Sequence, residues 1–233
     1  MKAAILLCDE VQEMYIPEFG GYCDMIQSMF AAIGKAVDFD TFDCRQHDFP
    51  NSLDEYAFFI TTGSKHSVYE NADWIKSTIV FIRKLIDENK KLIGICFGHQ
   101  LIAMAYGKEV KKSEKGWGLG VARNRVSNPQ NWMQDVKTEL NIIVSHQDQV
   151  VAVPDDAIVI AGSDFCPYFF VQWSRSVVSI QGHPEWITAY SQKRIGDRQE
   201  ILSEDVFNSA LVSTEIPPDN AMFTRWLWNF IQA

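Results

Sequence analysis

The chain has 233 residues, of which 47% are hydrophobic and 22% are charged, and its formal net charge at pH 7 is −9. This length and apolar content suit one large α/β domain with a sizeable core. The negative charge argues against general binding to nucleic acid or to anionic membranes, because phosphate contacts need clustered lysine and arginine. We expect neither as a partner.

Cysteine usage and hydropathy indicate a compartment. The five cysteines, at positions 8, 23, 44, 96 and 166, are widely spaced and include no C-x-x-C pair. Such spacing favours neither a disulfide framework nor a zinc site. The apolar run at the start is too short for a signal peptide, and none approaches the ~20 residues of a membrane span. We therefore expect a cytoplasmic protein.

The first half of the chain alternates predicted strands with predicted helices. Strands are expected at 3–8, 37–42, 56–62 and 92–96, and helices at 22–35, 73–89 and 101–106. Asp73 is the expected N-cap of the second helix. This alternation, without repeats, predicts a parallel sheet covered on both faces.

From Trp117 onward the pattern changes to shorter strands. These are expected at 118–121, 142–144, 158–161 and 168–173, and they predict an antiparallel extension. Another buried strand follows at 177–181, and helices are expected at 198–212 and 220–231. Nothing resembles a linker, so we predict a single domain over residues 1–233.

Polar groups follow several of the predicted strands directly. Three strand ends carry Gly63-Ser64, Cys96 and His183-Pro184-Glu185, and a fourth carries Ser145-His146-Gln147-Asp148. Open parallel sheets bind ligands beyond the carboxyl ends of their strands. This convergence predicts a functional site without any knowledge of a family.

Cys96 lies in the pattern Gly94-Ile95-Cys96-Phe97-Gly98, at the end of an apolar run. The pattern is typical of a nucleophile on a sharp strand-to-helix turn, where the neighbouring residues come too close for large side chains. The N-terminus of the following helix would favour the thiolate. The alternative is an inert core cysteine.

A cysteine nucleophile needs a base, and the base needs an acceptor that fixes its tautomer. His183 and Glu185 suit these tasks, because residues i and i+2 of a strand point to the same side. A purely structural His183 is the alternative. Two other histidines, His99 and His146, are rival candidates for the base. The remaining two, His47 and His66, are expected at the surface. No histidine pair has the helical spacing of metal ligands, so we expect no metal or cofactor.

These motifs carry a family resemblance. The segments Gly94–Gln100 and Gln181–Glu185 together resemble the class I glutamine amidotransferase domain, and the likeness extends to about Trp186. Ser145–Asp148 is similar to an element of its GMP synthase-like branch. Lys115-Gly116-Trp117 and the Gln-Gly-His-Pro-Glu form resemble its stand-alone members, including γ-glutamyl peptidases. The resemblance implies a flavodoxin-like, doubly wound, mainly parallel sheet with helices on both faces and a small antiparallel extension.

The resemblance also implies a reaction. A triad of Cys96, His183 and Glu185 would hydrolyse the side-chain amide of glutamine through a γ-glutamyl thioester, releasing ammonia and glutamate. The N–H groups of Gly63 and Phe97 would hold the oxyanion. Three further residues match positions at the substrate: Gln100, Ser145 and His146.

The chain departs from the family pattern at the oxyanion loop and before His183. Thr62-Gly63-Ser64 replaces the usual Gly-Gly-Pro, and Gly182 replaces an aromatic residue. The smaller side chains suggest a pocket that accepts more than free glutamine.

Other readings stay open at this stage. One is a γ-glutamyl peptidase acting on glutathione-like conjugates, and another is a catalytically silent glutamine-binding regulatory subunit. The chain has no Gly-rich ATP-binding loop, so a separate synthetase or acceptor subunit would have to use any ammonia. Four aromatic residues fit either a core or an interface: Phe170, Trp173, Trp226 and Trp228.

Overall fold

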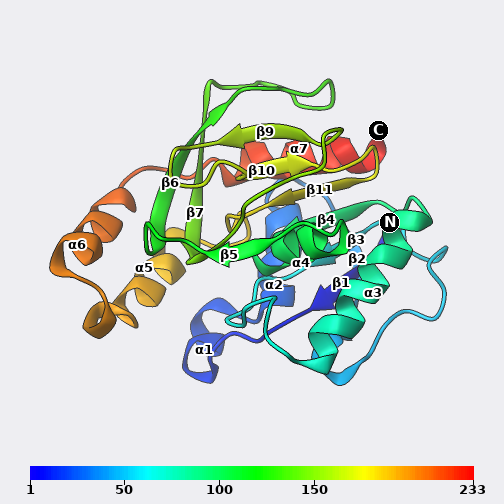
Figure 1. The fold of residues 1–233 in the computed structure, drawn as a ribbon, viewed down its shortest axis with the longest axis horizontal. Coiled ribbons are helices and arrows are strands. Elements are labelled where there is room, and N and C mark those ends of the chain that lie inside the picture. The colour runs from blue at the N-terminus through cyan, green and yellow to red at the C-terminus, as the bar shows by residue number, and fades with distance from the viewer.

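A nine-stranded sheet forms the centre of the computed structural model, which describes residues 1–233 (Figure 1). Its strand order is β2-β1-β3-β4-β11-β10-β9-β6-β7. The strands are β1 (Lys2–Leu7), β2 (Asp38–Asp43), β3 (Phe59–Thr61), β4 (Leu92–Ile95), β6 (Gly118–Val126), β7 (Glu139–His146), β9 (Ile158–Gly162), β10 (Phe170–Gln172) and β11 (Val177–Ile180). A small second sheet pairs β5 (Val110–Lys112) with β8 (Asp148–Val150).

The sheet has a parallel part and an antiparallel part. Strands β2, β1, β3, β4 and β11 are parallel neighbours, in the order typical of flavodoxin-like sheets. Beyond β11 the neighbouring strands are antiparallel: β11 pairs with β10, β10 with β9, β9 with β6, and β6 with β7. The predicted fold class is therefore confirmed, with the antiparallel extension joined edge to edge to the parallel sheet.

Helices cover both faces of the parallel part. On one face α2 (Tyr22–Ala31) and α7 (Asn220–Gln232) pack against Ala3 and Ile5 of β1. On the other face α3 (Asp73–Asp87) and α4 (Phe97–Ala105) share a core with Ala4 and Leu6 of the same strand. Strands buried on both faces read as continuous apolar runs, which explains why this part was readable from sequence.

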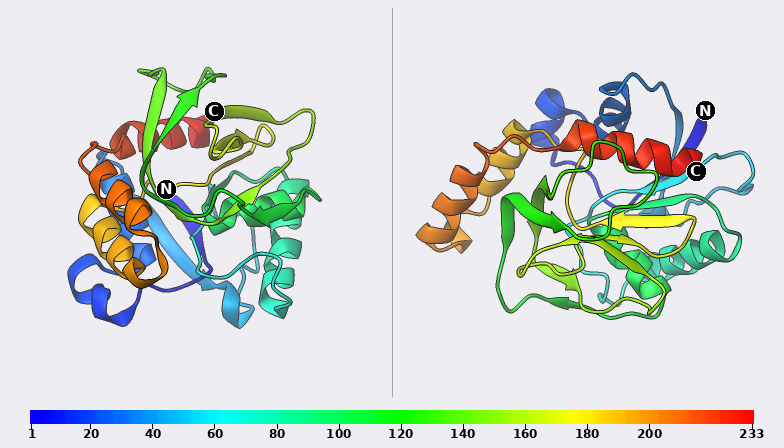
Figure 2. Two further views of the ribbon diagram at one scale, coloured as in Figure 1. Left: turned by 60° about the vertical axis from the view of Figure 1, so that its left-hand side comes forward. Right: turned by 90° about the horizontal axis from the view of Figure 1, so that it is seen from above.

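Two further helices lie beside the antiparallel extension. Helices α5 (Thr188–Gly196) and α6 (Glu204–Ser213) lie side by side (Figure 2); α5 contacts β6 and β7, and α6 contacts β6. A short helix, α1 (Ile16–Phe19), follows β1. No helix in the chain combines the length and the apolar character needed to cross a membrane.

The structure corrects several element predictions. Helix α5 was not predicted, and the helix expected at 198–212 begins only at Glu204, because the Ser203 side chain caps α6 by accepting from Val206 N–H. Asp73 is the first residue of α3 rather than its cap. Three of the four ambiguous aromatic residues are fully buried core residues: Phe170, Trp173 and Trp226.

Candidate active site

The carboxyl ends of three adjacent parallel strands meet at one edge of the sheet. Strand β4 lies between β3 and β11, with Gly94 opposite both Thr61 and Ser179. The chain beyond these ends carries Gly63, Cys96 and His183. The predicted convergence of these segments is therefore observed.

Cys96 sits in the turn between β4 and α4, and its backbone is in an unusual conformation. Its φ is 50° and its ψ is −98°, and its N–H donates to the carbonyl of Ile180 at 2.8 Å. A positive φ is uncommon for a residue with a side chain and is found where surrounding structure imposes it, often at active sites. The thiol lies at the N-terminus of α4 and is 4% exposed.

The two glycines around Cys96 are required by close packing. A Cβ on Gly98 would lie 1.5 Å from Thr61 Oγ1, and a Cβ on Gly94 would lie 2.9 Å from the carbonyl of Gly98. Neither position can accept a side chain without a backbone shift. The steric explanation inferred from the sequence pattern agrees with these contacts.

His183 is held on three sides. The ring Nδ1 lies 2.7 Å from Glu185 Oε1, and the ring stacks on Trp186 with centroids 3.9 Å apart. The backbone N–H of His183 donates to the carbonyl of Ile143 at 2.7 Å. Burial lowers the pKa of His183, but the Glu185 carboxylate and Cys96 outweigh burial and raise it to about 10. The imidazole is therefore positioned and held as a cation at neutral pH.

The contact between His183 and Glu185 has a different origin from the one expected. Strand β11 ends at Ile180, so the two residues do not alternate along a strand. They lie in a turn in which Trp186 N–H donates to the carbonyl of His183 at 3.3 Å, and Asn220 Nδ2 of α7 donates to the carbonyl of Trp186 at 2.7 Å.

Gly63 brings the three segments together. A Cβ at Gly63 would lie 2.7 Å from His183 Cε1 and 3.6 Å from Cys96 Cβ. Because Gly63 has no Cβ, its backbone can lie close to the Cys96 side chain and to the His183 imidazole. Phe97 lies in the first turn of α4, where backbone N–H groups have no partner within the helix.

Cys96 opens onto a cavity of about 330 Å³. All three predicted substrate-contact residues line it, and so does a segment that precedes α3. The lining residues are Ser64, Lys65, His66, Ser67, Cys96, Gln100, Trp117, Ser145, His146, Gln147, Asp148 and Arg198. His66, expected at the surface, therefore faces the cavity.

Comparison with known proteins identifies the family. The family model for class I glutamine amidotransferases matches residues 15–199. The chain belongs to the class I glutamine amidotransferase family. Members of this family are cysteine hydrolases, so the chain is an enzyme of that type.

Curated relatives and a solved structure agree with this placement. Gamma-glutamyl peptidase 3 of Arabidopsis thaliana is 32% identical over 99% of this chain and 96% of its own length. Gamma-glutamyl peptidase 4 of the same organism is 33% identical, covering 79% and 76%. A glutamine amidotransferase from Thermotoga maritima has the same fold, with a TM-score of 0.74, 19% identity, and coverage of 99% of this chain and 96% of that one.

The two rival histidines, His99 and His146, differ in their surroundings. His99 is completely buried, with its Nδ1 2.7 Å from Ser179 Oγ, and burial lowers its pKa to about 3. It lies outside the lining of the cavity. His146 does line the cavity, and burial lowers its pKa to about 4. At neutral pH both are uncharged, in contrast to His183.

Gln181 is a site residue that the sequence reasoning missed. Its Nε2 donates to Cys96 Sγ at 3.5 Å, and its Oε1 accepts from Gln100 Nε2 at 3.2 Å. Gln100 also donates to the carbonyl of Asp148 at 3.1 Å. Its sequence signal was its place in the Gln181–Glu185 motif, directly after β11 and two residues before His183.

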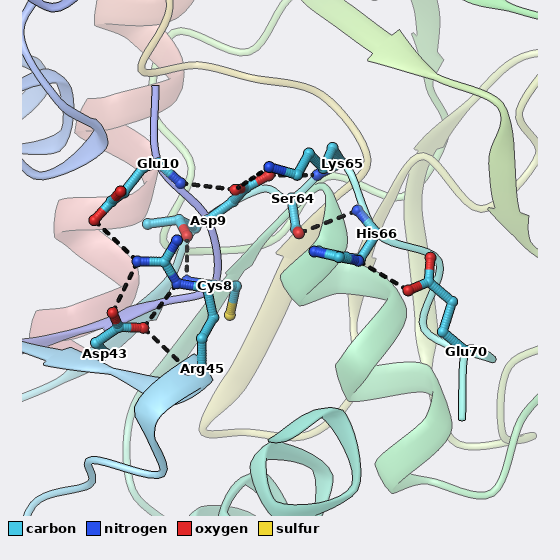
Figure 3. Close-up of polar contacts among 10 residues, drawn as sticks. Cys8, Asp9, Glu10, Asp43, Arg45, Ser64, Lys65, His66 and Glu70 are labelled. Atoms are coloured by element: carbon cyan, nitrogen blue, oxygen red, sulfur yellow. Dashed lines mark hydrogen bonds and ion pairs between the residues drawn. The ribbon is translucent and has the colours of Figure 1, made fainter. Parts of the chain in front are cut away.

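The segment before α3 is fastened to the first residue of β8. The Asp148 carboxylate accepts from Ser67 Oγ at 2.5 Å and from Tyr69 Oη at 2.9 Å. Figure 3 shows the opposite side of the same segment, where Asp9 accepts from Lys65 N–H and His66 reaches Glu70. The cavity wall is thus held at both ends.

The suggested effect of Gly182 on the pocket is wrong. A Cβ on Gly182 would lie 2.6 Å from Ile142 Cγ2 and 2.9 Å from Phe169 Cζ. Both are buried core residues, and neither lines the cavity at Cys96. The space of the usual aromatic side chain is filled by Phe169 and Ile142, so Gly182 does not enlarge the pocket.

Proposed function

We propose that this amidotransferase hydrolyses γ-glutamyl amides with a triad of Cys96, His183 and Glu185. The observation that carries the proposal is the Glu185-paired His183 beside a cysteine held at positive φ. A buried imidazolium next to the sulfur stabilises the thiolate, which is the nucleophilic form. Glu185 keeps the ring oriented and charged.

The reaction has two stages. Cys96 Sγ attacks the γ-carbonyl, and the developing oxyanion accepts hydrogen bonds from the N–H groups of Gly63 and Phe97, each worth about 3 kcal/mol in comparable enzymes. His183 then protonates the leaving nitrogen, and the C–N bond breaks to give a γ-glutamyl thioester. Water, deprotonated by His183, cleaves the thioester to glutamate and restores Cys96.

Gln100, Ser145 and His146 would bind the glutamyl group. Their places in the cavity that contains Cys96 support this role. His146 Nδ1 donates to the carbonyl of Asp148 at 3.2 Å, so the Nε2 of the neutral ring is left to accept one hydrogen bond from the substrate, and His146 does not compete with His183 for the proton.

Peptide-like γ-glutamyl compounds are the substrates we favour, with glutamine as the second candidate. The near full-length similarity to proteins named gamma-glutamyl peptidases supports the first, and the family model supports the second. If glutamine is the substrate, an ammonia acceptor on another polypeptide stays a prediction. We further propose that residues 1–233 form one domain, since a single sheet joins both halves of the chain. Cytoplasmic location stays a prediction.

The test measures amine and glutamate release from glutamine and from a panel of γ-glutamyl peptides. Cys96→Ala and His183→Ala should each lower kcat/KM by at least about 10³-fold, while Cys23→Ala, a cysteine of α2, should not change it. A γ-glutamyl chloromethyl ketone should label only Cys96, as seen by peptide mass spectrometry. Retained turnover in both triad variants, or labelling of another cysteine, would refute the assignment.

A further inference from the structure

A second, smaller cavity adjoins the first on the side of His183. It measures about 110 Å³ and is lined by His183 and Trp186 but not by Cys96. It shares part of its wall with the larger cavity: Ser64, Lys65, Ser145 and Arg198. In the proposed reaction His183 hands its proton to the leaving nitrogen, so the leaving group must extend toward this side.

The acidic residues of the small cavity are already paired within the protein. Asp9 is 4% exposed and accepts from the N–H groups of Glu10 and Lys65 at 2.9 and 2.8 Å, with Lys65 Nζ at 3.4 Å. The Glu10 carboxylate lies 2.9 Å from Arg45 Nη2. Figure 3 shows both carboxylates turned toward these partners. They are therefore poorly suited to bind a cationic ligand.

Arg198 is the exception among the charged residues. Its guanidinium lies over the Trp117 ring at 4.7 Å, and its Nη1 donates to the carbonyl of Arg194 at 2.6 Å. It forms no ion pair, because the nearby Asp197 is paired with Arg194. Burial and the neighbouring Arg194 lower the pKa of Arg198 to about 10. A half-buried arginine without a carboxylate is costly unless an anion binds it.

Arg198 belongs to the wall that the two cavities share, and its guanidinium forms one hydrogen bond, from Nη1 to the carbonyl of Arg194. A guanidinium presents a planar fork of donors that matches a carboxylate bidentately. The cation–π contact with Trp117 restrains the guanidinium, which reduces the entropy lost on binding.

We propose that Arg198 binds the carboxylate of the amino acid or peptide that leaves from the γ-glutamyl group, which makes the smaller cavity a leaving-group subsite. The inference rests on the proposed function and deepens it. Ammonia has no group that can reach Arg198, so the subsite selects γ-glutamyl peptides with a free carboxyl terminus over glutamine.

The test compares substrates that differ only in that carboxylate. The pairs are γ-glutamylglycine with γ-glutamylglycinamide, and γ-glutamyl-cysteinylglycine with its carboxamide. In the wild type, at least one pair should show a kcat/KM about 10- to 100-fold higher for the acid, the range of a charged hydrogen bond. Arg198→Gln should bring that ratio near one, mainly through KM, and Arg198→Lys should retain part of it.

Lys193→Gln is the matched control, because it removes an exposed positive charge from α5 without touching either cavity. Its acid-to-amide ratio should equal that of the wild type. Equal rates on acid and amide in the wild type would overturn the inference and leave the proposed function intact, and this comparison does not depend on whether a variant folds. If the folded Arg198→Gln variant kept the wild-type acid-to-amide ratio of kcat/KM, the inference would also be overturned. No turnover of any γ-glutamyl compound would overturn the proposed function and the subsite with it.

Discussion

Replacing Glu185 with Gln should change how the stability of the protein depends on pH. Gln keeps the shape of the side chain and an oxygen that can accept from His183 Nδ1, but it removes the carboxylate charge 2.7 Å away. That charge is the largest influence that raises the pKa of His183 against burial. The pKa of His183 should therefore fall in the variant.

The magnitude follows from proton linkage. The folded wild type binds a proton at His183 with a pKa of about 10, whereas a histidine in the unfolded chain has a pKa of about 6.5. At about 1.4 kcal/mol per pKa unit, protonation stabilises the wild type by about 5 kcal/mol below pH 6.5. This contribution is lost as the pH rises from 6.5 through 10. Breaking a buried ion pair costs about 3–5 kcal/mol, and we expect about 3 at pH 7 because Gln keeps the hydrogen bond.

The assay is urea unfolding of wild type and Glu185→Gln at pH values from 6 to 10.5. Other groups titrate in both proteins, so the difference between their free energies of unfolding isolates the pair. The difference should be about 3 kcal/mol at pH 7 and should vanish or reverse above pH 10, where the wild type buries a carboxylate without its counter-ion. A difference that is constant, or grows with pH, would refute the reasoning.

Three further changes probe the structure independently. Gly98→Ala places a methyl group 1.5 Å from Thr61 Oγ1 and should lower stability by more than about 3 kcal/mol in urea unfolding, whereas Gly196→Ala, with no neighbour within 4 Å, should raise it by about 0.5–1 kcal/mol. Asp148→Ala removes both hydrogen bonds to the segment before α3, so hydrogen exchange at 64–70 should accelerate and KM should rise about tenfold. Burial lowers the pKa of His99 to about 3, whereas a histidine in the unfolded chain has a pKa of about 6.5. The free energy of unfolding of the wild type should therefore fall by about 1.4 kcal/mol per pH unit as the pH drops from 6.5 towards 3. His99→Gln should reduce this slope in urea unfolding, and an unchanged slope would contradict the burial effect.

The parallel half of the fold and the order of its site segments were predictable from the sequence. Strands β1, β3 and β4 are buried on both faces, so their apolar runs mark them without tertiary information. The turn at Cys96 was equally readable, because the crowding around Gly94 and Gly98 acts through residues close together in the chain. Local constraints of this kind leave a signature that one sequence can carry.

The walls of the site were not predictable in the same way. Arg198 lies just after α5 and His66 lies in the segment before α3, and folding brings these distant segments to the wall of one cavity. Neither residue belongs to a motif, and α5 itself lacks a capping side chain that would announce its start. Side chains whose role depends on distant partners give no periodic or local signal.

Gly182 illustrates why a departure from a family pattern must be read in three dimensions. The sequence suggested that a missing aromatic side chain leaves room for a larger substrate, but Phe169 and Ile142 fill that room from the core side. Substrate range must then be set by the loops that form the cavity walls, which are fastened by Asp9 on one side and Asp148 on the other. These loops leave Arg198 as the one wall cation without a carboxylate partner in the small cavity. If the proposed function holds, selection among γ-glutamyl compounds should therefore depend on charge at the far end of the leaving group rather than on bulk beside the proposed triad.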